Sequence, residues 1–166
     1  MGMVGTQLLK MDPNEVIALL NQAFADEWLA YYQYWIGTKV VKGPMKESLI
    51  TELTQHAADE LRHADLLSNR IIQLGGTPLL KPDEWLTYSH CGYEAPDNPY
   101  ITFVLNQNIK GEQCAIKFYQ NVMDITKDKD MVTYDLVFRI LQDEVEHEED
   151  LQAIAEDIEL MLKNIK

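Results

Sequence analysis

The stretch DELRHAD, residues Asp59–Asp65, places an acid and an imidazole where an amphipathic helix is expected to be apolar. Glu60 and His63 are three residues apart, so they lie on one face of a helix. Apolar residues recur at helical spacing on that same face, namely Leu49, Leu53, Ala57, Leu67, Ile71 and Leu74. Because an unpaired carboxylate is costly to bury, the stretch predicts that partners come from elsewhere in the chain.

Four long helices are expected, and strand-like alternation is nearly absent. Asp12 followed by Pro13, and Asn98 followed by Pro99, are typical helix starts, and the pair Gly75-Gly76 is a stop signal. The expected helices run from Asp12 to about Lys42, from about Pro44 to Gly75, from Asn98 to about Thr126, and from the turn at 127–130 to about Lys163.

The connections between these helices predict how they are arranged. Two are short, whereas the one between the second and third helices is long and contains PDEWLTY (Pro82–Tyr88), which favours a short helix. This pattern predicts an all-α four-helix bundle with a long crossover between helices 2 and 3. We expect residues 1–11 to be a flexible N-terminal segment and residues 12–166 to form the bundle domain.

The other three helices supply the partners that Glu60 and His63 need. On the fourth helix, Glu144 and His147 repeat the acid-to-histidine spacing within an apolar stripe. A single acid interrupts the stripe of each remaining helix, Glu27 on the first and Glu112 on the third. Glu60 follows Glu27 by 33 residues and Glu144 follows Glu112 by 32, so the acids are expected at matching depth.

Four carboxylates and two imidazoles that converge from four helices are a ligand set for two divalent metals. In this hypothesis Glu60 and Glu144 bridge the ions, and His63 and His147 hold one ion each. The alternative is a set of surface acids on solvated helix faces. Iron and manganese both suit these ligands.

Two further residues are candidates for supporting roles. Tyr34 lies seven residues after Glu27 and could hydrogen-bond a ligand, although a core tyrosine with a satisfied hydroxyl fits equally well. His56 lies four residues before Glu60 on the same face. It could support the ligands or hold iron at an inner surface, or it could be a satisfied core or surface histidine.

The overall composition excludes several classes of function. The net charge of −13 in 166 residues argues against nucleic-acid binding, which needs clustered Lys and Arg, and suits attraction of cations. No secretory signal or membrane-spanning run is evident, so we expect a cytoplasmic protein without a membrane partner. Two cysteines cannot build a zinc ribbon or a rubredoxin-type site, each of which needs four ligands.

The segment ELRHADLLSNRIIQLGGTP, residues 60–78, strongly resembles the second helix of bacterioferritins. With the helices, crossover and ligands, the resemblance to the ferritin superfamily covers roughly residues 12–163. It implies that the ferroxidase-centre ligands are Glu27, Glu60, His63, Glu112, Glu144 and His147. Bacterioferritins carry a haem-ligating methionine where this chain has Leu61, so no haem is expected.

Other features are similar to one subgroup of this superfamily. Cage-forming ferritins of 24 subunits usually add a fifth short helix, for which the three residues after Lys163 leave no room. A short helix in the middle connection is instead a feature of the 12-subunit Dps proteins. A bacterioferritin-like site in a Dps-like body, with Cys91 in the loop and Cys114 after Glu112, resembles the Dps-like thioferritins.

The resemblance implies a ferroxidase that oxidises Fe(II) with H2O2 or O2 at a centre of two iron ions. It also implies protection against oxidative stress and storage of ferric mineral in a homo-oligomeric cage. The cage is expected to be a 12-mer, with 24 subunits as the alternative. A first alternative is a non-storing di-metal enzyme, either a rubrerythrin-like peroxidase or a manganese catalase. A second is a structural or metal-buffering bundle without redox turnover.

The two cysteines form the last candidate pair. Cys114 lies about 200° around the helix from Glu112, so it is expected to face away from the metals. The long connection could cross the bundle there and bring Cys91 alongside. The pair could then cycle between dithiol and disulfide and supply two electrons; the alternative is two unrelated thiols.

Overall fold

The computed structural model describes residues 2–164 and is built from helices. These are α1 (Met3–Leu8), α2 (Pro13–Val40), α3 (Lys46–Gln73), α4 (Pro82–Tyr88), α5 (Ile101–Thr126) and α6 (Met131–Asn164). Within the described residues the one strand-like pairing is an isolated bridge between Lys42 and Tyr100. The all-α prediction is confirmed, including the short helix at Pro82–Tyr88.

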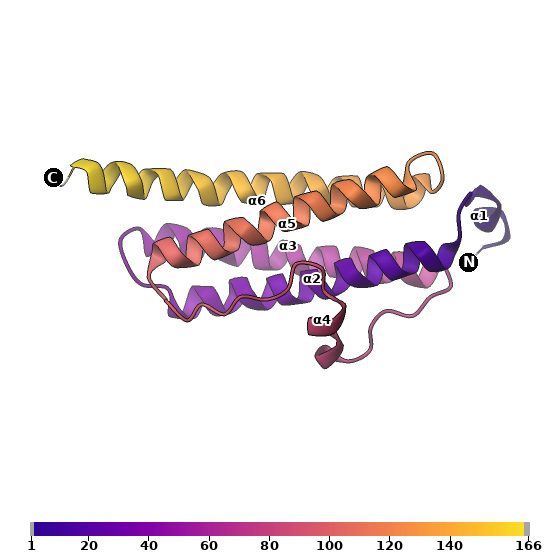
Figure 1. Ribbon diagram of the computed structural model, residues 1–166, viewed down its shortest axis with the longest axis horizontal. Coiled ribbons are helices and arrows are strands. Elements are labelled where there is room, and N and C mark those ends of the chain that lie inside the picture. Colours follow the sequence, from indigo (N-terminus) through magenta and orange to yellow (C-terminus); the bar gives the residue numbers. More distant parts are fainter. Residues whose placement is uncertain (1, 165–166) are drawn as a thin grey trace.

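The four long helices lie side by side along the long axis of the molecule (Figure 1). α2 packs mainly on α3, and α5 packs mainly on α6, so the chain forms two antiparallel helix pairs. The segment between α3 and α5 travels back along the bundle, and α3 and α5 therefore run in the same direction (Figure 1). This is the crossover that the sequence predicts.

The helix starts follow local capping chemistry, with one correction. Asp12 accepts a hydrogen bond from the backbone N–H of Asn14 at the start of α2, as predicted. The prediction that the third helix starts at Asn98-Pro99 is wrong, because α5 begins at Ile101. The Ile101 N–H donates to the Lys42 carbonyl and the Lys42 N–H donates to the Pro99 carbonyl, both at 2.8 Å. This pairing keeps residues 99–100 extended and delays the helix.

The apolar core is divided into two clusters, one toward each end of the bundle. The first cluster contains Val16, Leu20, Leu67 and Ile140, among others. The second contains Leu49, Leu53, Val104, Leu151 and Ile158, among others. On every long helix, the predicted acid lies in the sequence between the residues of the two clusters. A polar layer therefore separates two well-packed halves.

The crossover segment is fastened to α2 and α5. The indole of Trp85 on α4 stacks on Trp28 of α2 with ring centroids 5.0 Å apart. Asp26 of α2 accepts hydrogen bonds from the Ser89 hydroxyl (2.6 Å) and the Cys91 N–H (2.8 Å). Cys91 is joined to Cys114 of α5 by a disulfide. We call residues 89–98 the strap, since they pass over the bundle and are held at these points.

The N-terminal segment contains the short helix α1, Met3–Leu8. Isolated helices of this length are only marginally stable in water. The short helix therefore does not test the expected flexibility of residues 1–11, which stays a prediction. Residues 1, 165 and 166, which the predicted segments include, lie outside the described residues. No helix within residues 2–164 is long and apolar enough to cross a membrane.

Candidate metal centre

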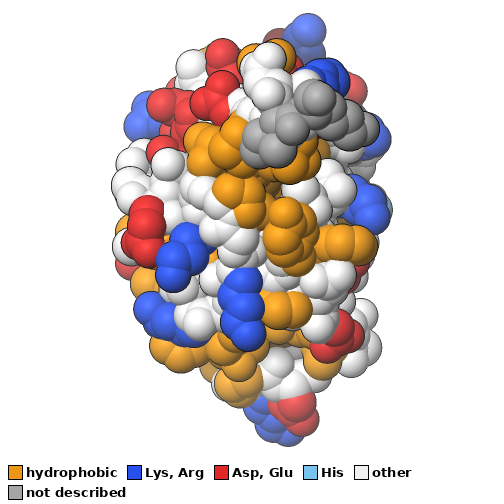
Figure 2. Space-filling view, turned by 90° about the vertical axis from the view of Figure 1, so that its left-hand side faces the viewer, with side chains coloured by type: hydrophobic (Ala, Val, Ile, Leu, Met, Phe, Trp, Pro, Cys, Tyr) orange, Lys and Arg blue, Asp and Glu red, His pale blue; other side chains and the backbone are white. Residues whose placement is uncertain are grey.

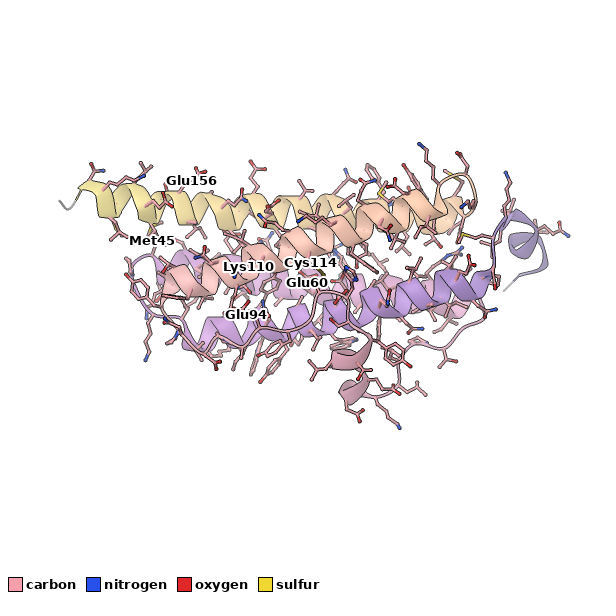
Figure 3. The ribbon with its side chains drawn as sticks, in the orientation of Figure 1. Met45, Glu60, Glu94, Lys110, Cys114 and Glu156 are labelled. Atoms are coloured by element: carbon pink, nitrogen blue, oxygen red, sulfur yellow. A yellow bond between two sulfur atoms is a disulfide. The ribbon has the colours of Figure 1, made fainter. Side chains whose placement is uncertain are left out.

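The polar layer brings together all six residues that the sequence predicts as ligands. α2 supplies Glu27, α3 supplies Glu60 and His63, α5 supplies Glu112, and α6 supplies Glu144 and His147. Each of the six is at most 3% exposed. Figure 3 shows Glu60 near the middle of the bundle's length, enclosed by the long helices.

The six side chains fall into two groups that share two carboxylates. One group is Glu27, Glu60, His63 and Glu144, and the other is Glu60, Glu112, Glu144 and His147. Within each group the potential ligand atoms lie within 4.8 Å of one another. Glu60 and Glu144 therefore occupy the positions from which a carboxylate can contact two ions.

Each histidine turns the same nitrogen toward this centre. His63 Nδ1 lies 3.0 Å from Glu60, 3.1 Å from Glu144 and 3.5 Å from Glu27. His147 Nδ1 lies 3.4 Å from Glu60, 3.5 Å from Glu144 and 3.7 Å from Glu112. The two halves of the centre thus repeat each other, with one imidazole and one terminal carboxylate on each side.

Several of these buried atoms face one another without forming a hydrogen bond, which leaves them available to a metal ion. Glu60 Oε1, Glu144 Oε1 and His147 Nδ1 make no hydrogen bond within the described residues. Leaving buried polar atoms unpaired costs roughly 1–3 kcal/mol each. Oxygen and imidazole donors suit Fe, Mn and Zn, so the residues present fit a pair of divalent cations.

The ionisation of the centre shows how the charges are balanced by protons. Although burial opposes it, contact with Glu144 and Glu60 raises the pKa of His147 to about 11, and the same carboxylates with Glu27 raise the pKa of His63. Burial, followed by repulsion from neighbouring carboxylates, raises the pKa of Glu27 and of Glu112 well above the usual range. The cluster therefore retains protons that arriving cations can displace.

Two aspartates that the sequence analysis did not single out orient the histidines. His63 Nε2 lies 3.0 Å from Asp143, and His147 Nε2 lies 3.5 Å from Asp59. A carboxylate on the outer ring nitrogen fixes the ring so that Nδ1 faces the centre. Arg62 bridges both aspartates, at 2.7 and 3.0 Å. The repeated pattern Asp-Glu-x-x-His, at Asp59 and again at Asp143, is a signal that could have found them.

Two tyrosines hold the terminal carboxylates across the bundle. Tyr34 of α2 donates a hydrogen bond to Glu112 of α5, so its predicted contact with a ligand is present, although the ligand is on another helix. Tyr119 of α5 donates to Glu27 of α2, a contact that the sequence did not predict. Each tyrosine follows the acid of its own helix by seven residues.

The geometry of the centre agrees with the similarity of this chain to proteins of known families. Residues 17–161 match the family described as the ferritin-like domain. This chain belongs to that family. The DNA protection during starvation protein of Pyrococcus furiosus is 30% identical to it over 139 residues, which cover 83% of this chain and 75% of that protein.

Solved structures extend the likeness of this ferritin-like chain to its whole fold. The bacterioferritin-related protein of Bacteroides fragilis, described as a dodecameric thioferritin, is 42% identical with a TM-score of 0.92, and the match covers 93% of this chain and 92% of that one. Dps from Thermosynechococcus elongatus is 19% identical with a TM-score of 0.81, covering 92% and 94% of the chains, which shows a shared fold. The chain is a Dps-like member of the ferritin superfamily, as its sequence predicts.

A pocket of about 400 Å³ connects the centre of this ferritin-like chain with the strap. It reaches Glu27, Glu60, Glu112 and Glu144 at its inner end. Gln33 of α2, Lys110 of α5 and strap residues 91–94 also line it. Cys91 therefore borders the pocket. Its disulfide partner Cys114 belongs to neither group of potential metal ligands.

Proposed function

We propose that this protein is a ferroxidase that binds two iron ions per chain and oxidises Fe(II) with H2O2 or O2. The observation that carries the proposal is the pair of four-residue groups that share Glu60 and Glu144. Two metals held about 3.5–4 Å apart can act together on one oxidant, with one electron supplied by each iron. Manganese suits the same donors, and no haem is part of the proposal.

The protein's own groups have distinct roles in this proposal. Glu60 and Glu144 would contact both ions, whereas Glu27 with His63, and Glu112 with His147, would hold one ion each. Asp143 accepts a hydrogen bond from the outer nitrogen of His63, and Asp59 lies 3.5 Å from the outer nitrogen of His147, so both aspartates keep the inner nitrogens directed at the centre. Binding requires neutral imidazoles and ionised carboxylates, so loading with iron releases the protons that the empty cluster retains.

We infer that Fe(II) and the oxidant enter through the pocket beneath the strap. Its inner end consists of carboxylates, and the net charge of the chain is −13, so cations are attracted toward it. The six candidate ligands are at most 3% exposed, which strengthens the interactions between the charged groups of the centre.

Storage and protection from oxidative stress complete the proposal. The dodecameric description of the Bacteroides fragilis relative supports a closed homo-oligomeric cage of twelve chains, and the net charge of −13 suits a cage that gathers cations. The end of the bundle where α6 finishes carries a band of hydrophobic side chains suited to contacts between chains (Figure 2). Exposed apolar residues near that end of the fold include Tyr100, Phe103, Leu160 and Leu162. The proposal includes no nucleic-acid partner, and the cytoplasm remains the proposed location.

The decisive experiment removes each bridging carboxylate. Glu60→Ala and Glu144→Ala are expected to abolish rapid Fe(II) oxidation, because each residue contacts both ions. The metal-free variants are expected to stay folded, since the empty centre is itself costly to bury. Ferric absorbance after addition of air or peroxide to anaerobically loaded protein measures the oxidation rate. The control is Glu146→Ala, which removes an exposed acid of α6.

Unchanged oxidation in both variants would end the di-iron proposal. Sedimentation of the same samples separates storage from the alternative enzymes. A stable monomer or dimer would favour a non-storing peroxidase or manganese catalase, whereas a large particle that gains ferric mineral supports the cage.

A further inference from the structure

We propose that Glu52, His56 and Asp150 form a third divalent-cation site, outside the two positions of the ferroxidase centre. Glu52 and His56 lie one turn apart on α3, and Asp150 lies on the neighbouring α6. The three potential ligand atoms lie within 4.8 Å of one another. None of the three residues is needed for the six-ligand centre described above.

The distances fit a cation at the face formed by α3 and α6. His56 Nε2 lies 3.5 Å from Asp150 Oδ2 and 4.0 Å from Glu52 Oε2. Donors that bind one ion at about 2.1 Å each are separated by roughly 3–4 Å, depending on the angle at the metal. The side chains of Asp150 and Glu52 are 37% and 31% exposed, respectively. They can therefore rotate by the small amount that is needed for both to contact one ion together with His56.

The imidazole of His56 supplies the observation that points to a ligand. It is 0% exposed, and neither of its ring nitrogens makes a hydrogen bond within the described part of the chain. A buried imidazole is normally satisfied by a donor or an acceptor. Here Nε2 faces two carboxylates at distances longer than a hydrogen bond but suitable for an ion between them.

An ion pair without a metal explains this arrangement less well. A protonated histidine forms short charge-assisted hydrogen bonds of about 2.7–2.9 Å with carboxylates. The nearest carboxylate oxygen here is 3.5 Å away. One histidine and two carboxylates with open positions for water suit Fe(II), Co(II), Mn(II) or Zn(II).

The site also has a clear relation to the centre. The His56 ring stacks on the His147 ring with centroids 3.9 Å apart. The partly exposed acids place the third cation nearer the surface than either group of centre ligands. Resting on the proposed function, this position gives iron a holding place between the centre and the α3–α6 face.

A competing role for His56 is support of the centre itself, since it also lies near Glu112 and His147. Glu52 and Asp150 separate the two roles, because they belong to neither group of centre ligands. The variants Asp150→Asn and Glu52→Gln therefore test the third site without touching the centre. Glu149→Gln removes an exposed acid next to Asp150 and serves as the matched control.

Anaerobic titration of the metal-free assembly with Co(II), followed by calorimetry and visible absorbance, counts the sites. The unaltered protein and Glu149→Gln are expected to bind three Co(II) per chain. Asp150→Asn and Glu52→Gln are expected to bind two. Equal stoichiometry and affinity in all four proteins would overturn the third site.

A second series makes the result independent of the ferroxidase proposal. In Glu60→Ala/Glu144→Ala protein, one Co(II) per chain is expected to remain and to be lost when Asp150→Asn is added. If no Co(II) remains in the double variant, the third site is contradicted while the centre stands. If the unaltered protein binds a single Co(II) that Asp150→Asn removes, the third site stands and the two-metal centre fails.

Discussion

Tyr119 on α5 donates a hydrogen bond to Glu27 on α2, on the opposite helix pair. Tyr34 makes the reciprocal contact with Glu112. Both bonds cross between the two antiparallel pairs, and each restrains a carboxylate that faces one side of the centre. The centre is therefore organised with approximate two-fold symmetry, by a tyrosine seven residues after an acid in each half.

This symmetry predicts similar effects for the two tyrosines. Tyr119→Phe and Tyr34→Phe are each expected to weaken metal binding or slow Fe(II) oxidation by about 10- to 100-fold, because a ligand loses the group that orients it. Metal titration and stopped-flow oxidation measure the change, with exposed Tyr32→Phe of α2 as the control. Rates equal to that control in both variants would show that the hydroxyls do not position the ligands.

The protons held by the centre predict how the stability of the metal-free protein depends on pH. The pKa of His63 and His147 is raised on folding, to about 11 for His147, so their contribution is complete below about 6.5 and is lost as pH rises toward 11. Glu27 and Glu112, whose pKa is also raised, act in the same direction. Although burial opposes it, contact with Glu27 and with the two histidines lowers the pKa of Glu60, so its contribution is instead lost as pH falls below about 4.5.

Urea unfolding of chelator-treated protein at pH 6 and pH 9 is expected to give a lower unfolding free energy at pH 9. The difference is on the order of a few kcal/mol, since each unit of pKa difference corresponds to about 1.4 kcal/mol. In metal-loaded protein, the unfolding free energy should fall less between pH 6 and pH 9, or should rise, because cations replace the protons. A metal-free protein that is more stable at pH 9 than at pH 6 would contradict this balance of charges.

A buried ion pair predicts where the bundle is most sensitive outside the centre. Arg70 near the end of α3 contacts both oxygens of Asp130, at 2.8 and 2.9 Å, and donates to Thr133 at 2.8 Å. Asp130 is 3% exposed and also accepts from the Thr133 N–H at the start of α6. Asp130→Ala is expected to destabilise the protein by about 3–5 kcal/mol, because it leaves a buried guanidinium unpaired. Chemical denaturation measures it, and exposed Asp128→Ala in the same turn should have a much smaller effect.

The bundle and the convergence of the six acids and histidines could be predicted from the chain alone. A charged residue such as Glu27 or Glu112 in an otherwise apolar stripe is conspicuous, because burial without a partner is so costly. The 33- and 32-residue spacings then place the acids at one depth in two helix pairs. Periodicity carries this information directly, since each long helix is continuous through the centre.

Contacts made across the bundle could not be predicted with the same certainty. Asp59 and Asp143 look like surface acids beside Glu60 and Glu144, because only the packing of α3 against α6 brings each one to the opposite histidine. The predicted start of α5 was wrong for a related reason. Residues 99–100 are kept extended by pairing with Lys42, which lies 58 residues from Tyr100 along the chain. The attachment of the strap through Asp26 likewise depends on tertiary contacts that no local sequence pattern predicts.

The disulfide between Cys91 and Cys114 leads to the last prediction, which concerns redox chemistry at the mouth of the centre. Cys91 borders the same pocket as Glu60 and Glu144, so an oxidant on its way to the centre passes this bond. In the cytoplasm, the location proposed above, a transient disulfide is more expected than a purely structural one. We expect the reduced pair to give two electrons and two protons to one H2O2, forming the disulfide and two molecules of water.

Thiol counting on reduced, iron-loaded protein before and after peroxide tests this expectation. Two thiols per chain should disappear after one equivalent of peroxide, and Cys91→Ser and Cys114→Ser should consume less peroxide while still binding metal. The variants should also lose about 3 kcal/mol of stability relative to the oxidised protein, the chain-entropy value for a loop of this size. If both thiols persist through many turnovers and the variants consume peroxide at the normal rate, the cysteines fasten the strap and take no part in the reaction.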